Sequence, residues 1–145
     1  MDGKQLYALS IKQPWAALLA HGLKTVEVRG WSSRRRGRVL IHAGRVPDRR
    51  AHAWTLVPDF LREAARQVGG IVGSAELTDC ITYATAEVFA ADRARHLNDP
   101  SWFRGRKLYG FTFANMVPLP LRPCTGALFF FPVADESTLG QAAPE

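Results

Sequence analysis

Ala8-Leu-Ser-Ile-Lys-Gln-Pro-Trp-Ala-Ala-Leu-Leu-Ala-His-Gly-Leu-Lys-Thr-Val-Glu-Val-Arg-Gly-Trp31 is the stretch with the densest local structural signals in the chain. Pro14 suits the first turn of a helix, because its fixed φ is helical and its missing N–H would have no partner there. Gly22 can take the left-handed conformation that ends a helix. Polar residues then alternate with two valines, as in a strand with one polar face. The stretch therefore predicts a strand over 6–11, a helix over 14–21, a turn and a strand over 25–29.

The polar face of the last of these elements carries Thr25, Glu27 and Arg29, and Lys24 directly precedes it. Two large aromatic residues, Trp15 and Trp31, flank Lys24, Glu27 and Arg29 in the sequence. A carboxylate beside an arginine on a strand is commonly a half-exposed ion pair. Arginine can also clamp phosphate, glutamate can accept from an amino group, and tryptophan can stack on a base. The residue types therefore leave open both a surface ion pair and a site for a planar polar ligand with anionic groups.

This stretch, followed by Arg36-Gly-Arg-Val-Leu-Ile-His-Ala43, resembles the ASCH domain (activating signal cointegrator homology). Three later segments resemble the same family in the same order, namely residues 73–80, 109–115 and 126–132. The resemblance covers roughly residues 5 to 132. It implies an α+β fold, a small PUA-like β-barrel flanked by short helices, with a cleft between barrel and helices. The family is generally associated with RNA or other nucleic-acid ligands.

The remaining sequence predicts further strands over 38–43, 71–80, 108–115 and 127–132. Between them, Pro47-Asp48 and Pro58-Asp59 are candidate helix starts. Apolar residues from Phe60 to Val68 recur at helical spacing, which predicts one helix ended by Gly69-Gly70. Thr85 is a candidate N-cap for a helix to about Arg95. The proline-rich residues 117–123 predict an extended connection outside the regular sheet.

The net charge of +6 and the pI of about 9.9 favour polyanionic partners. The chain holds 15 Arg but only 4 Lys and is rich in Ala, so genome composition is an alternative explanation for the charge. The basic residues nevertheless cluster, at Arg34, Arg35, Arg36 and Arg38, at Arg45, Arg49 and Arg50, and at Arg104, Arg106 and Lys107. The first cluster sits on an expected exposed turn, which is either solvated or a phosphate contact.

The length of 145 residues predicts one domain over residues 1–133, followed by a disordered tail over 134–145. No apolar run approaches the ~20 residues that span a membrane, and no secretory signal is evident, so we expect a cytoplasmic protein. Cys80 and Cys124 have no C-x-x-C partner, so neither a zinc site nor another metal site is expected. No nucleotide-cofactor motif occurs, and we expect no cofactor. The oligomeric state stays open.

Our first functional hypothesis is a module that binds RNA, single-stranded DNA or a nucleotide-like small molecule. In it, Trp31 or Tyr109 stacks on a base, while Glu27 and Asn115 read the edge of that base. The positively charged residues hold phosphate; they are Lys24, Arg29, Arg34, Arg35, Arg36 and Arg38.

An alternative is a small amidohydrolase that acts on an acylated nucleoside such as acetylated cytidine, as some small bacterial relatives of the family do. Their motif is G-x-K-T-x-T-x-R with a glutamate from a later strand. The resemblance implies Lys24 as the lysine, Arg29 as the arginine and Glu76 as the glutamate, but Glu27 stands where the family has its threonine nucleophile. Catalysis would then need Glu27 or Glu76 as a base toward water. A third hypothesis is a protein-interaction domain whose basic surface is incidental.

Overall fold

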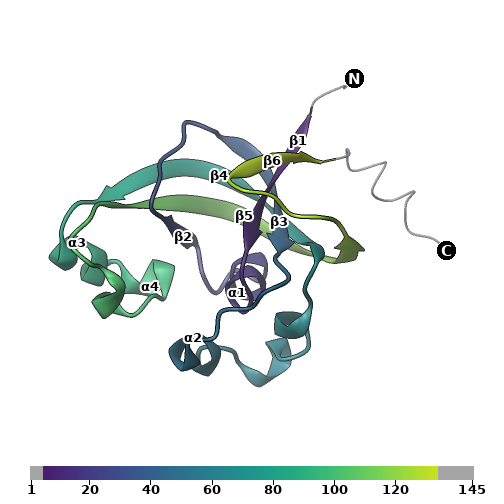
Figure 1. Ribbon diagram of the computed structural model, residues 1–145, viewed down its shortest axis with the longest axis horizontal. Coiled ribbons are helices and arrows are strands. Elements are labelled where there is room, and N and C mark those ends of the chain that lie inside the picture. Colours follow the sequence, from purple (N-terminus) through teal and green to yellow (C-terminus); the bar gives the residue numbers. More distant parts are fainter. Residues whose placement is uncertain (1–4, 134–145) are drawn as a thin grey trace.

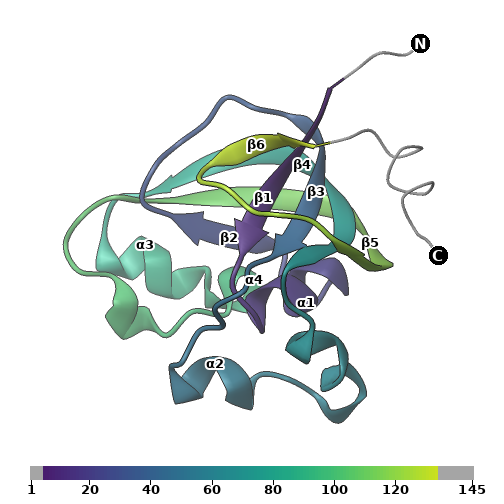
Figure 2. The ribbon, with the colours of Figure 1, turned by 45° about the vertical axis from the view of Figure 1, so that its right-hand side comes forward.

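The computed structural model describes residues 5–133, and its centre is a curled six-stranded sheet in the shape of a half-barrel (Figures 1 and 2). The strands follow the order β2-β5-β4-β3-β1-β6 across the sheet. Their bounds are β1 Leu6–Ile11, β2 Val26–Arg29, β3 Gly37–Ala43, β4 Gly70–Tyr83, β5 Leu108–Pro123 and β6 Phe130–Val133. Together with several short helices, this sheet confirms the predicted α+β class.

The pairing of β1 with β3 is parallel, whereas every other pairing in the sheet is antiparallel. Ile11 at the end of β1 lies opposite Ala43 at the end of β3. The amide of Gly44 continues this pairing, since it donates to the Ile11 carbonyl at 3.0 Å. The residues that follow the two strands therefore emerge side by side at one edge of the sheet, and this edge becomes one wall of the pocket described below.

The helices are short and lie on one side of the sheet and at its ends (Figure 1). Helix α1 (Trp15–Ala20) is buried along its whole length against β3, β4 and β5. The β4–β5 connection holds α3 (Ala86–Ala91), α4 (Arg93–His96) and the 3₁₀ turn η3 (Pro100–Trp102). The β3–β4 connection holds α2 (Ala51–Thr55) with the 3₁₀ turns η1 (Asp59–Leu61) and η2 (Ala64–Arg66). Within residues 5–133, no helix has the length and apolar composition needed to cross a membrane.

The core forms where α1 meets the concave face of the sheet. Leu18 and Leu19 of α1 are fully buried against apolar side chains of the strands, including Ile41 and Phe111. Complete burial of such a side chain contributes roughly 1.5–3 kcal/mol. The predicted first strand, the helix from Pro14 and the turn at Gly22 are confirmed, with Gly22 at a φ of +81°. The Gln13–Pro14 peptide bond is cis.

The single helix predicted between residues 59 and 70 is wrong. The structure has two separate 3₁₀ turns there, η1 and η2, each anchored by one buried side chain, Leu61 and Ala65. Phe60 is 74% exposed, and Val68 is also exposed, so the apolar residues do not form one continuous buried stripe. Without such a stripe, tertiary packing gives no support to a longer helix.

The segments after β4 and at the end of β5 also differ from expectation. The helix predicted from Thr85 is divided into α3 and α4 at Asp92, although the Thr85 hydroxyl does accept from the Val88 amide as predicted. The proline-rich 117–123 segment belongs to β5 and pairs with β4. Prolines are tolerated there because β2 pairs with β5 only as far as Thr112, which leaves the later residues on an open edge. The predicted tail, residues 134–145, lies outside the described residues.

Gly70 generates a prediction about the sheet. A Cβ atom at this position would collide with the carbonyl oxygen of Arg122 in the paired strand β5, which cannot easily move. We expect Gly70→Ala to lower the free energy of unfolding by about 1–3 kcal/mol. Gly30→Ala is the matched control, because a Cβ there meets nothing within 4 Å. Urea unfolding followed by circular dichroism measures both, and equal stability of the two variants would contradict the observed β4–β5 register.

Candidate functional site

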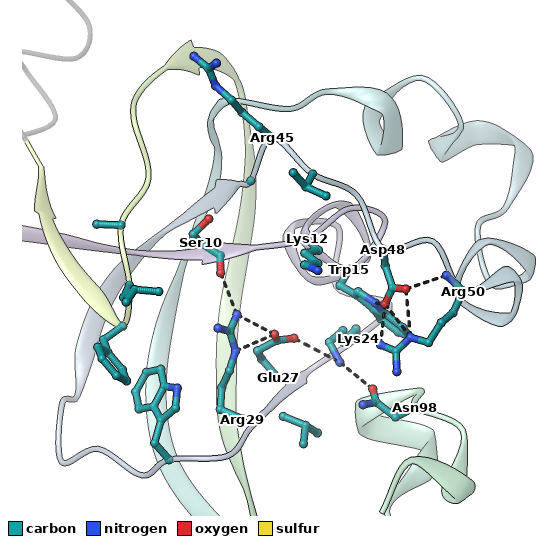
Figure 3. Close-up of a pocket in the computed structure, with 17 residues that line it drawn as sticks. Ser10, Lys12, Trp15, Lys24, Glu27, Arg29, Arg45, Asp48, Arg50 and Asn98 are labelled. Atoms are coloured by element: carbon teal, nitrogen blue, oxygen red, sulfur yellow. Dashed lines mark hydrogen bonds and ion pairs between the residues drawn. The ribbon is translucent and has the colours of Figure 1, made fainter.

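A pocket of about 510 Å³ opens between the carboxyl ends of β1 and β3, strand β2, the segment before β6 and Asn98, two residues beyond the end of α4 (Figure 3). Most of its polar lining comes from segments that the sequence analysis treated separately. The lining residues are Ser10, Lys12, Trp15, Lys24, Glu27, Val28, Arg29, Trp31, Gly44, Arg45, Val46, Asp48, Arg50, Asn98, Ala127, Leu128 and Phe129.

Lys24 forms the deepest cationic group of the pocket, and only 1% of it is exposed. Its ammonium donates to the backbone carbonyl of His96 at 2.7 Å and lies 3.5 Å from a carboxylate oxygen of Glu27. It also lies 4.8 Å from the centre of the Trp15 ring, which places it against the negative face of an aromatic system. Burial lowers the pKa of Lys24 to about 8, because the Glu27 carboxylate offsets only part of the desolvation and the Arg29 charge adds to it.

The carbonyl that holds Lys24 is itself fixed by a buried histidine. His96 stacks on Phe89 with ring centroids 4.2 Å apart. Its Nδ1 accepts from the amide of Asn98 at 2.9 Å, so its Nε2 carries the hydrogen and donates to the Phe89 carbonyl at 2.7 Å. Burial lowers the pKa of His96, which favours this neutral form. The end of α4 is therefore a rigid support for the Lys24 ammonium.

Glu27 and Arg29 lie on one face of β2, as the alternating pattern predicts. Arg29 donates from Nε to one carboxylate oxygen of Glu27 at 3.1 Å, and its Nη2 forms an ion pair with the same oxygen at 3.0 Å. It also donates to the backbone carbonyl of Ser10 at 2.9 Å, which ties β2 across the pocket to β1. Figure 3 shows the resulting chain of contacts from Ser10 through Arg29 and Glu27 to Lys24. These side chains form the pocket floor.

Asp48 is a pocket residue that the sequence analysis assigned to a helix start, which is wrong. No helix begins there, and the carboxylate is only 6% exposed. It accepts from the indole N–H of Trp15 at 2.8 Å and from Arg50 at 2.7 Å. Burial alone raises the pKa of Asp48, but these hydrogen bonds outweigh burial and hold it well below its usual range. The sequence signal that could have identified Asp48 is Trp15, because the N–H of a buried tryptophan usually has a hydrogen-bond acceptor.

An apolar rim covers one side of the pocket. Trp31 contacts Phe111 and Phe130 beneath it, with ring centroids 5.2 and 5.6 Å apart, and Phe129 edge-on at 4.9 Å. Leu128 and Phe129 are 81% and 55% exposed, although both are large apolar side chains. Phe129 also has a φ of +59°, a left-handed conformation that is uncommon for this residue type. The rim therefore presents apolar surface to the pocket at some cost in backbone energy.

Lys12 and Arg45 line the mouth of the pocket, and the sequence analysis missed both as site residues. Both are exposed, and neither side chain has a hydrogen bond or an ion pair with another residue in 5–133. Lys12 follows β1 and Arg45 lies two residues after β3, so the parallel pairing of these strands brings them to one edge. Only the register of the sheet reveals this arrangement, because the two residues are far apart in the sequence.

The arginines at positions 34, 35, 36 and 38 lie outside the pocket, contrary to their predicted role beside Lys24 and Arg29. The Arg35 guanidinium lies 3.7 Å from the centre of the Tyr7 ring, and Arg36 forms an ion pair with Asp79 at 3.6 Å. Arg34 and Arg38 are exposed and are not among the lining residues. The loop is an exposed segment, as predicted, whose two central arginines have partners within the protein.

Glu76, Asn115 and Tyr109 do not line the pocket either. Glu76 lies between the buried residues Ala75 and Leu77 and so points to the opposite, exposed face of β4. Its carboxylate accepts there from the Asn115 side chain at 3.1 Å. Tyr109 is half-buried opposite Arg29 in the β2–β5 register. The shared site of Glu76 and Lys24, which the family resemblance implied, is therefore wrong, because Glu76 lies on the exposed face of β4 and outside the pocket lining.

No cluster of three or more metal-binding side chains occurs in the part of the chain that the structure describes. Cys80 and Cys124 are both free thiols. The candidate site is therefore built from ion pairs, hydrogen bonds and aromatic side chains.

Comparison with known proteins places this chain in a family. The model of the ASCH domain matches residues 9–117, which include the end of β1, all of β2 to β4, most of β5 and the polar floor of the pocket. The chain belongs to the ASCH family. A region of 37 residues is 51% identical to the human protein Activating signal cointegrator 1. That match covers 26% of this chain but only 6% of the human protein, so it concerns a small part of that relative.

Solved structures support the ASCH fold over nearly the whole chain. The ASCH protein of Zymomonas mobilis superposes with a TM-score of 0.62 at 16% identity, covering 94% of this chain and 92% of that one. Its tyrosine-to-phenylalanine variant superposes with a TM-score of 0.67 at 15% identity, covering 96% and 97% of the two chains. At this identity the likeness establishes the fold. The predicted PUA-like α+β fold of the ASCH family is confirmed.

The Asp48 contacts predict a pH dependence. Because the pKa of Asp48 is lowered on folding, its ionised form stabilises the protein above its unfolded pKa of about 4, and this stability is lost as the pH falls further. We expect Asp48→Asn to lower the free energy of unfolding at pH 7 by about 1–3 kcal/mol. The difference from wild type should narrow below about pH 4. Asp59→Asn, which changes an exposed ion pair with Arg62, is the control and should differ little from wild type.

Lys24 predicts a distinct titration. The chain has four lysines, so its lysine side-chain NMR signals can be assigned by substitution. We expect one signal to titrate with a pKa of about 8 and to vanish in Lys24→Arg. Lys107→Arg, at an exposed position outside the pocket, should leave that signal in place. Four lysine signals that all titrate near the unperturbed pKa of about 10.4 would contradict the buried position of this ammonium.

Proposed function

We propose that this ASCH-family protein binds single-stranded RNA, single-stranded DNA or a nucleotide-like ligand in the pocket between β1, β2 and β3. The observation that carries the proposal is the combination of an ion-paired polar floor with an exposed aromatic rim in one cavity of about 510 Å³. That volume lies within the range of small-molecule sites, roughly 300–1,000 Å³. The association of the family with RNA supports the same ligand class.

Each part of the pocket suits one part of a nucleotide. Trp31 and Phe129 offer ring surface on which a base can stack, and such stacking contributes about 1–3 kcal/mol per base. Glu27 offers a carboxylate acceptor for base amino or imino groups, held in place by Arg29 and Lys24. Single-stranded RNA is read through such unstacked bases, whereas bases inside a duplex remain stacked and out of reach. The pocket therefore favours single strands over duplexes.

The contacts of the floor argue against the hydrolase alternative. Glu27 stands at the position of the family's threonine nucleophile, and its carboxylate is engaged by Arg29 and Lys24. Glu76, the other candidate base, is on the opposite face of the sheet and bonded to Asn115. A binding role requires no activated nucleophile and is compatible with the existing ion pairs of Glu27 with Arg29 and Lys24. A cytoplasmic location and the absence of a resident cofactor stay predictions.

The experiment is a titration of fluorescent single-stranded RNA, single-stranded DNA and duplex, each at low and moderate salt. We expect single strands to bind, and to bind more weakly at the higher salt. We expect Glu27→Gln to weaken single-strand binding about tenfold, because it removes a charged acceptor from the floor. Glu76→Gln is the matched control on the outer face and should bind as wild type does.

A second pair of variants keeps the test informative if the Glu27→Gln variant does not fold. Phe129→Ala changes an exposed ring at the rim and should weaken single-strand binding, whereas Phe60→Ala changes an exposed ring outside the pocket and should not. Equal binding by all four variants would refute the pocket as the site. Acetylated cytidine is incubated in parallel, and turnover that is lost in the Glu27 variant would replace the binding proposal with an enzymatic one.

A further inference from the structure

The pocket contains three chemically different zones, and the side chains of the third make no hydrogen bond or ion pair with another residue in 5–133. The floor of Lys24, Glu27 and Arg29 is internally paired, and the apolar rim packs on the core through Trp31. The mouth carries Lys12 and Arg45, whose side chains have no polar partner within residues 5–133. These two positive charges therefore remain available for groups from outside the protein.

The backbone places both positive charges at the mouth. Ile11 and Ala43 are opposite each other in parallel strands, so Lys12 and the Gly44–Arg45 segment continue from neighbouring positions. Asp48 is the carboxylate on this side of the pocket, but Arg50 and Trp15 already occupy it at 2.7 and 2.8 Å. Neither Lys12 nor Arg45 has a carboxylate partner among the described residues, so an anionic group of a ligand is the most direct partner for each charge.

Lys12 and Arg45 are directed differently. In Figure 3 Lys12 lies over the pocket between Ser10 and Trp15, whereas Arg45 extends from the end of β3 away from Lys24 and Glu27. The two side chains therefore meet different parts of a ligand. Lys12 is therefore directed toward a group that enters the pocket, while Arg45 is directed toward a part of a ligand that extends beyond the pocket.

We propose, on the basis of the binding function above, that the pocket takes one phosphorylated nucleoside unit with its phosphate at Lys12. The base lies against the rim of Trp31 and Phe129 with one edge toward Glu27. Arg45 binds the neighbouring phosphate of a longer single strand. Lysine suits the first role as a compact point charge, and arginine suits the second because its planar group can make paired hydrogen bonds to phosphate.

This assignment replaces the sequence-based one for phosphate. Lys24 is almost completely buried, and Arg29 uses its donors on Glu27 and Ser10, so both hold the floor in position. Arg35 and Arg36 are engaged with Tyr7 and Asp79. Of the pocket's cations, Lys12 and Arg45 can contact phosphate without breaking an existing contact between described residues.

The test is isothermal titration calorimetry of the full chain with the four nucleoside 5′-monophosphates and the four matching nucleosides at low salt. For at least one base, we expect the monophosphate to bind about tenfold or more tightly than its nucleoside. Lys12→Ala should reduce this ratio to near one and leave nucleoside affinity unchanged. Lys107→Ala, a matched change at an exposed position outside the pocket, should preserve the ratio.

Arg45 is tested with a trinucleotide RNA. Arg45→Ala should weaken trinucleotide binding several-fold while leaving monophosphate affinity within about twofold of wild type. Arg106→Ala, outside the pocket, is the control. If wild type binds monophosphates and nucleosides equally or not at all, or if Lys12→Ala keeps the ratio, the inference is overturned. In that case Glu27-dependent binding of longer RNA would leave the proposed function intact, whereas loss of all RNA binding would remove both.

Discussion

The buried ammonium of Lys24 is the constraint on which the site depends. Removing a positive charge from water is costly unless the protein supplies partners, so Lys24 can occupy this position only where acceptors surround it. The His96 carbonyl, the Glu27 carboxylate and the face of Trp15 supply them from three different elements. Helix α1, strand β2 and the end of α4 must therefore meet, and the pocket is the space left beside that meeting point. Asp48 has the matching role on the other wall, where it joins Trp15 to Arg50.

This construction makes the floor preorganised. Glu27, Arg29 and Lys24 already satisfy one another, so a ligand does not have to order them before it binds. The His96 ring, stacked on Phe89 and hydrogen-bonded through both nitrogens, extends the same rigidity into the layer behind the floor. A preorganised Glu27 carboxylate also discriminates between ligands, because a ligand without a hydrogen-bond donor gains no binding free energy from contact with it. Under the proposed binding function, ligand selectivity therefore resides in groups that are already partnered in the free protein.

The sequence predicted what depends on local pattern. Alternation from Thr25 to Arg29 placed Glu27 and Arg29 on one face of β2, and Gly22 ended α1, because both features are properties of a few consecutive residues. The family motif then supplied the fold. What failed depended on register and tertiary packing. Glu76 was expected beside Lys24 from the family motif alone, but its side chain lies on the exposed face of β4, outside the pocket. Lys12 and Arg45 were missed as pocket residues because a linear pattern does not reveal the parallel pairing of β1 with β3. Asp48 was missed because a linear pattern does not show that its carboxylate accepts from the buried indole N–H of Trp15.

The arginine-rich loop shows why the number of charges is a poor guide to a binding surface. The densest basic run in the chain lies outside the pocket, and its central arginines contact an aromatic ring and an aspartate of the protein itself. Lys12 and Arg45 carry more functional information, because the fold brings both to the lining of one pocket and gives them no polar partner among the described residues. An exposed charge without a partner can attract an anion at long range, whereas a paired and buried one mainly fixes geometry. Salt should therefore act on this protein through Lys12 and Arg45, while the shape and hydrogen-bonding pattern of the floor should be nearly independent of salt.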